Sequence, residues 1–243
     1  RTAAKTTTTT TIATTAAATT IATTARTTAT TTTITTTTTA NTATMASTTT
    51  VTTITGSPSG AITRTGDPII GICNTIAGGS TIGGSGNNYP AAEYPPNAID
   101  GNINTKYLNF GDGSTGCYGS APPGINTGFY ITPTISNATV AIGLLFATSN
   151  DFPTRDPTTV TLEGTNETST TALNSGASWT LIYNGSTGID SYIDSNRLTY
   201  VSRQNFSNTM AFSSYRLLVT AKRGVSNSVQ YAEAHIMGYI YNS

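Results

Sequence analysis

The chain has 243 residues and a formal net charge of zero, and only 9% of its residues are charged. This sparse and balanced charge argues against a nucleic-acid-binding protein, which needs a basic face to displace counterions, and against a polybasic membrane-binding patch. No run of about eighteen apolar residues occurs, so we expect no membrane insertion.

Residues 1–55 differ in composition from the rest of the chain. They contain 32 Thr and 12 Ala, and no Gly, Pro, aromatic or acidic residue. Thr is β-branched and loses rotamer freedom in a helix, so this composition disfavours a helix. The few isoleucines follow neither a helical nor a strand period, and so little apolar surface cannot form a core. We therefore expect residues 1–55 to form an extended arm.

Two roles fit such an arm. It could be an O-glycosylated stalk of the mucin type, kept extended by its sugars. Alternatively, it could be an extended strand that completes the sheet of a neighbouring copy. Fully extended, 55 residues reach about 180 Å, far enough to cross more than one neighbour. We expect the arm to contact neighbouring chains more than its own domain, because its backbone N–H and C=O groups need partners.

Residues 56–243 carry all the aromatic side chains and form the expected folded domain. Gly- and Pro-rich turns separate short alternating runs, and no segment has a convincing helical stripe. This pattern predicts an antiparallel β-sandwich or barrel. In the expected strands, three sets of side chains each share a face: Val140, Ile142, Leu144 and Phe146; Trp179, Leu181 and Tyr183; Tyr215, Leu217 and Val219. Further strands are expected at residues 69–76, 129–132, 159–164 and 229–240.

One loop and the order of the segments after it resemble a known family. Residues 96–107, PNAIDGNINTKY, resemble the Asp-Gly loop of discoidin-like, coagulation-factor C-type and related carbohydrate-binding modules. The segment TSNDFPTRDP at residues 148–157, the segment WTLI at 179–182 and the closing segment YAEAHI at 231–236 follow in the same order. Tyr107 stands where the family usually has Trp. The resemblance implies a jelly-roll β-sandwich of the galactose-binding type.

The resemblance also implies a structural Ca²⁺ ion in the Asp-Gly loop. Asp100, Asn102 and Thr105 supply oxygen ligands of the kind that Ca²⁺ prefers, and Glu233 on the last strand would complete the set. Gly101 permits the sharp bend. The alternative is an Asx-type turn that binds no metal.

The two cysteines, Cys73 and Cys117, form no CxxC pair and, with a single His, no zinc set. In a secreted domain they would form one disulfide, which on the loop-entropy model adds about 3–4 kcal/mol. The alternative is two buried thiols. The low charge and the implied fold favour the disulfide and an extracellular location.

No pattern in the sequence indicates catalysis, so we do not expect an enzyme. Asn150, Asp151, Arg155 and Asp156 form a polar cluster, interpreted as a loop held by an Arg155–aspartate pair, with sugar binding as the alternative. The single His235 is expected to pack on the last strand, on the face of Glu233 and Met237. N-glycosylation sequons occur at Asn137, Asn166, Asn184 and Asn205, with Asn166 in a loop and Asn184 in a turn as the better exposed sites.

The sequence leaves two functions open. In the first, the chain is the structural subunit of an extracellular, glycosylated helical filament that assembles through its arm, with copies of itself and glycans as partners. The alternative is a lectin-like, carbohydrate-binding adhesion module on a mucin-like stalk. The fold alone does not separate them, because one fold serves many functions.

Overall fold

The computed structural model describes residues 34–40, 43–49, 60–81, 88–111, 117, 121–189 and 196–241. The chain divides into two units, Arg1–Thr55 and Gly56–Ser243, at the point where the composition changes. In the first unit, β1 (Ile34–Ala40) and β2 (Ala43–Thr49) pair as antiparallel strands. The arm is thus extended here and pairs with itself. Its expected contacts with other chains stay a prediction, and its other residues lie outside the described ones.

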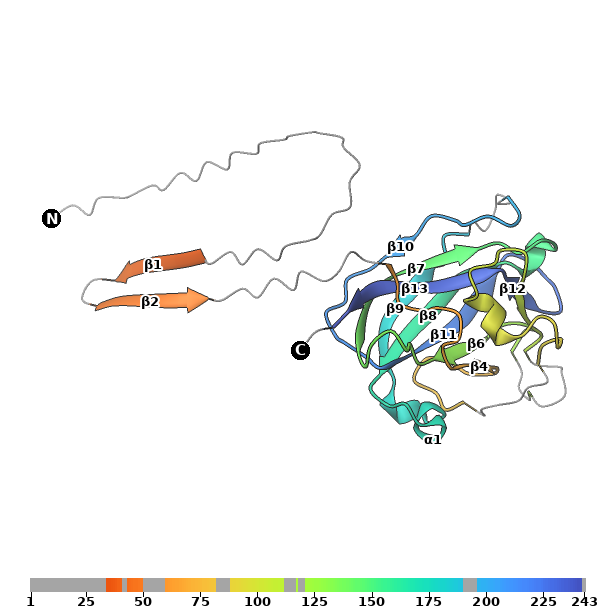
Figure 1. The fold of residues 1–243 in the computed structure, drawn as a ribbon, viewed down its shortest axis with the longest axis horizontal. Helices are drawn as coiled ribbons and strands as arrows, with labels where there is room; N and C mark the ends of the chain where they lie inside the picture. Colours follow the sequence, from red (N-terminus) through yellow and green to blue (C-terminus); the bar gives the residue numbers. More distant parts are fainter. Residues whose placement is uncertain are drawn as a thin grey trace. The chain divides into compact units, whose positions relative to one another are not determined.

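The second unit is a β-sandwich of two antiparallel sheets, which confirms the predicted fold class (Figure 1). The four-stranded sheet has the order β10-β7-β13-β3, the five-stranded sheet has the order β4-β6-β11-β8-β9, and β12 pairs with β5. The strands are β3 (Gly60–Ala61), β4 (Ile69–Ile72), β5 (Tyr107–Asn109), β6 (Thr127–Ile131), β7 (Thr139–Ala147), β8 (Pro157–Thr165), β9 (Thr180–Ser186), β10 (Gln204–Asn205), β11 (Ser214–Lys222), β12 (Val229–Tyr231) and β13 (Glu233–Ile240).

Helical structure in the described residues is limited to single turns. They are α1 (Thr170–Leu173) and the 3-10 turns η1 (Pro95–Ala98), η2 (Pro153–Arg155) and η3 (Gly176–Ser178). None of these is long and apolar enough to cross a membrane. The shortness of these turns agrees with the lack of a helical stripe in the sequence.

The main core lies between the two sheets. Tyr215, Leu217 and Val219 from β11 are fully buried in it, as the alternation predicts. Val160 and Leu162 from the neighbouring β8 join them. Burying one such aliphatic side chain stabilises the fold by about 1.5–3 kcal/mol, so this face fixes the register of both strands.

A β-bulge changes which side chains of β7 face this core. Met237 of β13 lies opposite Gly143, but the next residue of β13 lies opposite Ala141, so Ile142 has no partner. The extra residue reverses the alternation, and Ala141 joins Leu144 and Phe146 in the core while Ile142 is only half-buried. The predicted shared face is therefore wrong at Ile142 and at Val140, which is buried but is not part of the main core.

The predicted shared face of Trp179, Leu181 and Tyr183 is also wrong. Trp179 packs in a second cluster with Tyr130 and Leu218, on the other face of the five-stranded sheet. Leu181 is 51% exposed, and Tyr183 packs against the main core. A register shift between β8 and β9 after Leu162 separates these positions.

Two links hold the segment after β4 to the sandwich. Cys73 and Cys117 form a disulfide with their Cα atoms 6.1 Å apart, within the usual range. A buried ion pair joins Arg216 Nε to Glu163 Oε2 at 2.7 Å, and the other Glu163 oxygen accepts a hydrogen bond from Gly78 N. The Arg216 guanidinium lies 4.7 Å from the centre of the Trp179 ring.

Candidate functional site

The predicted metal loop follows η1 and is closed by hydrogen bonds to Asp100. One carboxylate oxygen of Asp100 accepts from Asn102 N and the other from Thr105 Oγ1, both at 2.8 Å. Gly101 has φ +76°, a conformation that glycine adopts without steric cost. This is the Asx-type turn that the sequence allowed, and it presents carboxylate and hydroxyl oxygens close together.

Glu233, the first residue of β13, is fully buried. Burial raises the pKa of its carboxyl, and the nearby Asp100 raises it further, whereas His235 lowers it. His235 Nε2 lies 3.0 Å from Glu233 Oε2, yet neither Glu233 oxygen accepts a well-directed hydrogen bond from the described residues. A buried carboxylate with this deficit fits a bound cation, because an isolated buried charge is unfavourable.

The donor set is that of a hard cation such as Ca²⁺, which binds six to eight oxygens. Asp100, Thr105 and Glu233 fit it. The Asn102 side chain is engaged instead by Asn104, which donates to it from its backbone and its side-chain nitrogen, both at 3.2 Å. Among the described residues no three His, Cys, Asp or Glu side chains converge, so a bound Ca²⁺ would also need main-chain oxygens.

His235 packs beside this loop, on the face that it shares with Glu233. Its Nδ1 lies 3.4 Å from Thr63 Oγ1, and its ring stacks on Tyr200 with the ring centres 6.4 Å apart. His235 is thus held on three sides, as expected for a packed histidine.

A second polar surface surrounds Phe152, in the loop between β7 and β8. Phe152 is 54% exposed and has φ +42° and ψ +72°, in the left-handed region that bulky residues avoid. The Arg155 guanidinium covers one face of its ring, 4.1 Å from the centre. Strained, exposed residues of this kind cluster at binding sites, where function compensates their cost of about 1–3 kcal/mol.

Arg155 is fixed by two amide groups from the β12 region. Its Nη1 donates to Gln230 Oε1 at 3.4 Å and its Nη2 to Asn227 Oδ1 at 3.0 Å. The predicted clasp is not a direct bond: Arg155 acts on Asp151 through its charge, whereas Arg197 holds Asp156 through bonds of 2.8 and 2.9 Å to both carboxylate oxygens. Arg155 is thereby left to position the Phe152 ring.

Asp151 extends the same surface. Its Oδ1 accepts from Lys106 Nζ at 2.7 Å and from Gln230 Nε2 at 2.9 Å. Lys106 Nζ also lies 3.4 Å from a carboxylate oxygen of Glu93. Partial burial tends to raise the pKa of Asp151, but the bonds from Lys106 and Gln230 outweigh it, so the pKa is lowered. The carboxylate therefore stays ionised near neutral pH and offers acceptor oxygens at the surface.

We name the residues around this ring the Phe152 surface. It combines one exposed aromatic face with amide, carboxylate, ammonium and guanidinium groups from three loops and from β12. Its members are Lys106, Asp151, Phe152, Arg155, Asn227 and Gln230. Sequence analysis identified Asp151 and Arg155 as candidate site residues. It missed Phe152, Lys106, Asn227 and Gln230, because their roles depend on contacts between segments that are far apart in the sequence.

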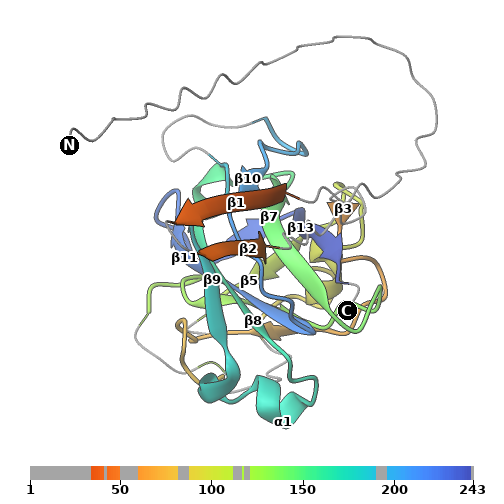
Figure 2. The ribbon, with the colours of Figure 1, turned by 90° about the vertical axis from the view of Figure 1, so that its left-hand side faces the viewer.

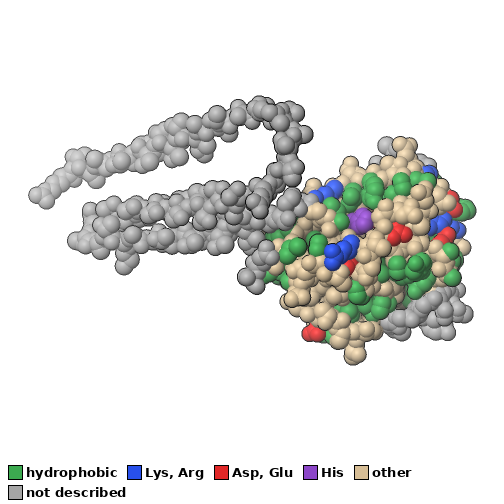
Figure 3. Space-filling view, in the orientation of Figure 1, with side chains coloured by type: hydrophobic (Ala, Val, Ile, Leu, Met, Phe, Trp, Pro, Cys, Tyr) green, Lys and Arg blue, Asp and Glu red, His purple; other side chains and the backbone are tan. Residues whose placement is uncertain are grey.

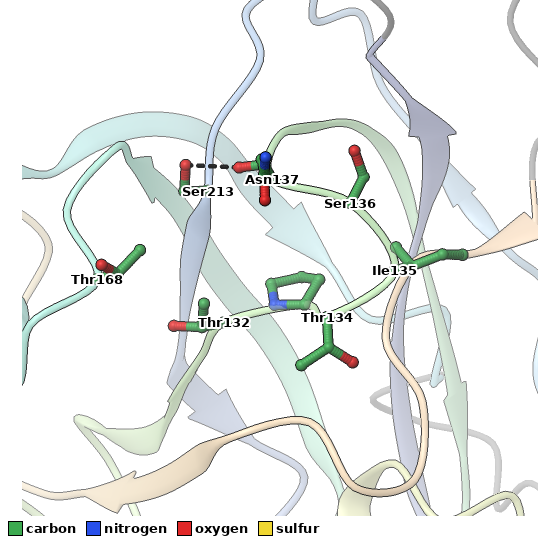
Figure 4. Close-up of a pocket in the computed structure, with 8 residues that line it drawn as sticks. Thr132, Thr134, Ile135, Ser136, Asn137, Thr168 and Ser213 are labelled. Atoms are coloured by element: carbon green, nitrogen blue, oxygen red, sulfur yellow. Dashed lines mark hydrogen bonds between the residues drawn. The ribbon is translucent and has the colours of Figure 1, made fainter.

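A large groove lies elsewhere on the sandwich. It has a volume of about 800 Å³ between the β6–β7 loop and Ser213, and its lining contains hydroxyl groups, an amide and two apolar residues (Figure 4). Ser213 Oγ donates to the Asn137 carbonyl at 2.7 Å. No aromatic or ionisable side chain lines this groove, so it offers a ligand neither a stacking face nor a charge-assisted hydrogen bond.

The four sequon asparagines are all exposed. Asn166 directly follows β8, as expected of a loop site. Asn184 lies inside β9, opposite Thr161, so the predicted turn at this position is wrong. Asn137 and Asn205 lie in the β6–β7 loop and in β10.

The sequence matches no family model and no curated protein. The fold is similar to the family 32 carbohydrate-binding module of Clostridium perfringens NanJ, solved with galactose; the identity is 13%, the TM-score is 0.47, and the match covers 74% of this chain and 98% of that one. A further C. perfringens module, CpGH89CBM32-5 with GalNAc-β-1,3-galactose, has 13% identity and a TM-score of 0.46, and the match covers 73% of this chain and 99% of that one. The fucolectin of striped bass (Morone saxatilis) has 10% identity and a TM-score of 0.42, and the match covers 71% of this chain and 47% of that one.

These similarities concern the plan of the β-sandwich alone. At such low identity they assign no site residue, and the Phe152 surface is defined by its own contacts.

Proposed function

We propose that the Gly56–Ser243 unit is an extracellular carbohydrate-binding module and that the Phe152 surface is its binding site. The observation that carries this proposal is the exposed Phe152 ring. It keeps an unfavourable backbone conformation, is covered on one side by Arg155 and is still 54% exposed. Ligand sites typically combine aromatic surface with a few placed polar groups that fix orientation.

The surrounding groups suit the hydroxyl groups of a sugar. Asp151 offers carboxylate oxygens as acceptors, and Lys106 and Asn227 offer N–H donors. Hydrogen bonds to charged groups are about twice as strong as neutral ones, which favours Asp151 as the main contact. In the view of Figure 3, charged side chains form small separate spots among uncharged ones, and this pattern supports a neutral rather than a polyanionic ligand.

The test is binding of the purified chain to an array of neutral and acidic glycans, with the Phe152→Ala variant alongside. We expect the wild type to bind neutral glycans and the variant to lose this binding. Met210→Ala, which truncates another exposed apolar side chain, is the matched control and should bind normally. Failure of the wild type to bind any glycan, or equal binding by Phe152→Ala, would contradict the proposal.

A structural Ca²⁺ ion at Asp100, Thr105 and Glu233 belongs to the same proposal. When bound, the ion would neutralise the buried Glu233 carboxylate and join the loop after η1 to β13. Lys106, next to this loop in the sequence, donates to Asp151, so the metal loop would also help to position the Phe152 surface. Secretion is supported by the Cys73–Cys117 disulfide, which persists in oxidising compartments.

Assembly of copies through the arm is the second candidate function. The observation in its favour is that β1 and β2 each contain seven extended residues, enough to add to a sheet edge. Head-to-tail assembly of this kind gives open chains, as the filament hypothesis requires.

A further inference from the structure

The two main sheets differ in how their edges are protected. The four-stranded sheet ends in β10 and β3, which have two residues each, and the five-stranded sheet ends in β4, with four residues, and β9, with seven. Short edge strands offer little backbone to another chain, so they resist unwanted pairing. Within the described sandwich, β9 is thus the longest edge strand.

The sequence of β9, TLIYNGS, contains no charged residue and no proline, the side chains that usually block an edge. Leu181 is 51% exposed on it. Apart from the ladder with β8, no backbone hydrogen bond to the described residues involves this strand. One protecting feature is present: a register shift leaves Ile182 without a partner in β8 and divides the edge into Thr180–Leu181 and Tyr183–Ser186. Figure 2 shows β9 extending from the α1 turn along the sandwich.

The arm supplies strands that match this edge. Residues 34–49 contain no glycine, proline or charged residue, and Thr favours extended structure. A two-stranded hairpin such as β1–β2 is at best marginally stable in water and needs a third strand or a packed face. Pairing with β9 would provide the third strand.

The connectivity favours a second copy as the source of the hairpin. The Tyr183 ring of β9 stacks on Phe206, just after β10, at 4.7 Å, so β9 and β10 lie on the same side of the sandwich. The arm joins the sandwich at β3, and β3 is at the opposite end of the sheet from β10. To pair with its own β9, the hairpin would have to reach across the sandwich from the point where the arm begins, whereas a neighbour can present β9 without this constraint.

We propose that β9 of one copy accepts the β1–β2 hairpin of another copy as added antiparallel or parallel strands. The contact joins different surfaces of the two copies, so it does not close on itself and can extend into a chain of copies. The inference is independent of sugar binding and gives the second candidate function a defined docking edge.

The test uses three full-length proteins analysed by sedimentation velocity over a range of concentrations. Leu181→Lys places a charge on the edge, and Thr37→Pro with Met45→Pro interrupts both arm strands. We expect the wild type to form a concentration-dependent series of oligomers, and each variant alone to be monomeric. A mixture of the two variants should form heterodimers, because one supplies an intact arm and the other an intact edge.

Met210→Lys, which adds the same charge to an exposed position outside the sheet edges, should assemble like the wild type. A monomeric wild type, normal assembly by Leu181→Lys, or a mixture that stays monomeric would overturn the proposal. Glycan binding separates the two functions, since Leu181→Lys should still bind glycans and Phe152→Ala should still assemble.

Discussion

The strained backbone of Phe152 gives a prediction in which stability and binding change in different ways. The residue has φ +42°, where a side chain carrying Cβ costs about 1–2 kcal/mol. Replacing it by Gly removes this cost but adds about 0.5–1 kcal/mol of conformational entropy to the unfolded chain. Replacing it by Ala keeps the cost. Both variants lose the same contact between the ring and Arg155, so this contact cancels in the comparison.

Phe152→Gly should therefore be more stable than Phe152→Ala by about 1 kcal/mol, the reverse of the order at ordinary positions. For a domain of this size, that difference corresponds to about 2–4 °C in Tm. Urea denaturation of the two variants measures it directly, and neither variant should bind glycans. An Ala variant at least as stable as the Gly variant would refute the argument that the structure tolerates strain here to display the ring.

Three further predictions concern the supports of the site. The pKa of Asp151 is lowered in the folded chain, so the stability that this carboxylate adds is present above the unfolded-state pKa of 3.8 and is lost as the pH falls through the lower folded-state pKa. Glycan affinity should therefore be constant down to the folded-state pKa of Asp151. In the Lys106→Met variant, a calorimetric titration should show that glycan affinity is lost at a higher pH. Replacing both Cys73 and Cys117 by Ser should lower the free energy of unfolding by about 3–4 kcal/mol in chemical denaturation. Excess chelator should lower the Tm of the wild type but not that of Glu233→Gln, and an equal fall in both, or none in the wild type, would argue against the metal.

The sequence predicted the sandwich because alternation is regular at Val160 and Leu162 of β8 and from Tyr215 to Val219 of β11, and these side chains are completely buried. It failed where a strand changes register. The bulge at Ile142 and the shift after Leu162 each insert a residue, and no local residue type announces such a shift. Asn184-Gly185 has the composition of a turn, but pairing with β8 keeps it in a strand, so tertiary contacts outweigh local preference here.

The candidate site was predictable only within single loops. The Asp100 turn forms between neighbouring residues, and its geometry follows from its local sequence. The partner of Asp156 is 41 positions away, at Arg197, and Gln230 reaches Asp151 across 79 positions. Arg155 and Asp156 are adjacent in the sequence, yet their side chains have separate partners: Gln230 of β12 accepts from Arg155, and Arg197 donates to Asp156.

The most direct test of carbohydrate binding at the Phe152 surface is an NMR titration of the ¹⁵N-labelled chain with a glycan that binds on the array. The proposal predicts that the amide signals that shift with glycan concentration are those of Asp151, Phe152, Arg155, Asn227 and Gln230. Shifts confined to the groove of Thr132, Thr134, Asn137 and Ser213, with these five signals unchanged, would place the sugar elsewhere and contradict it.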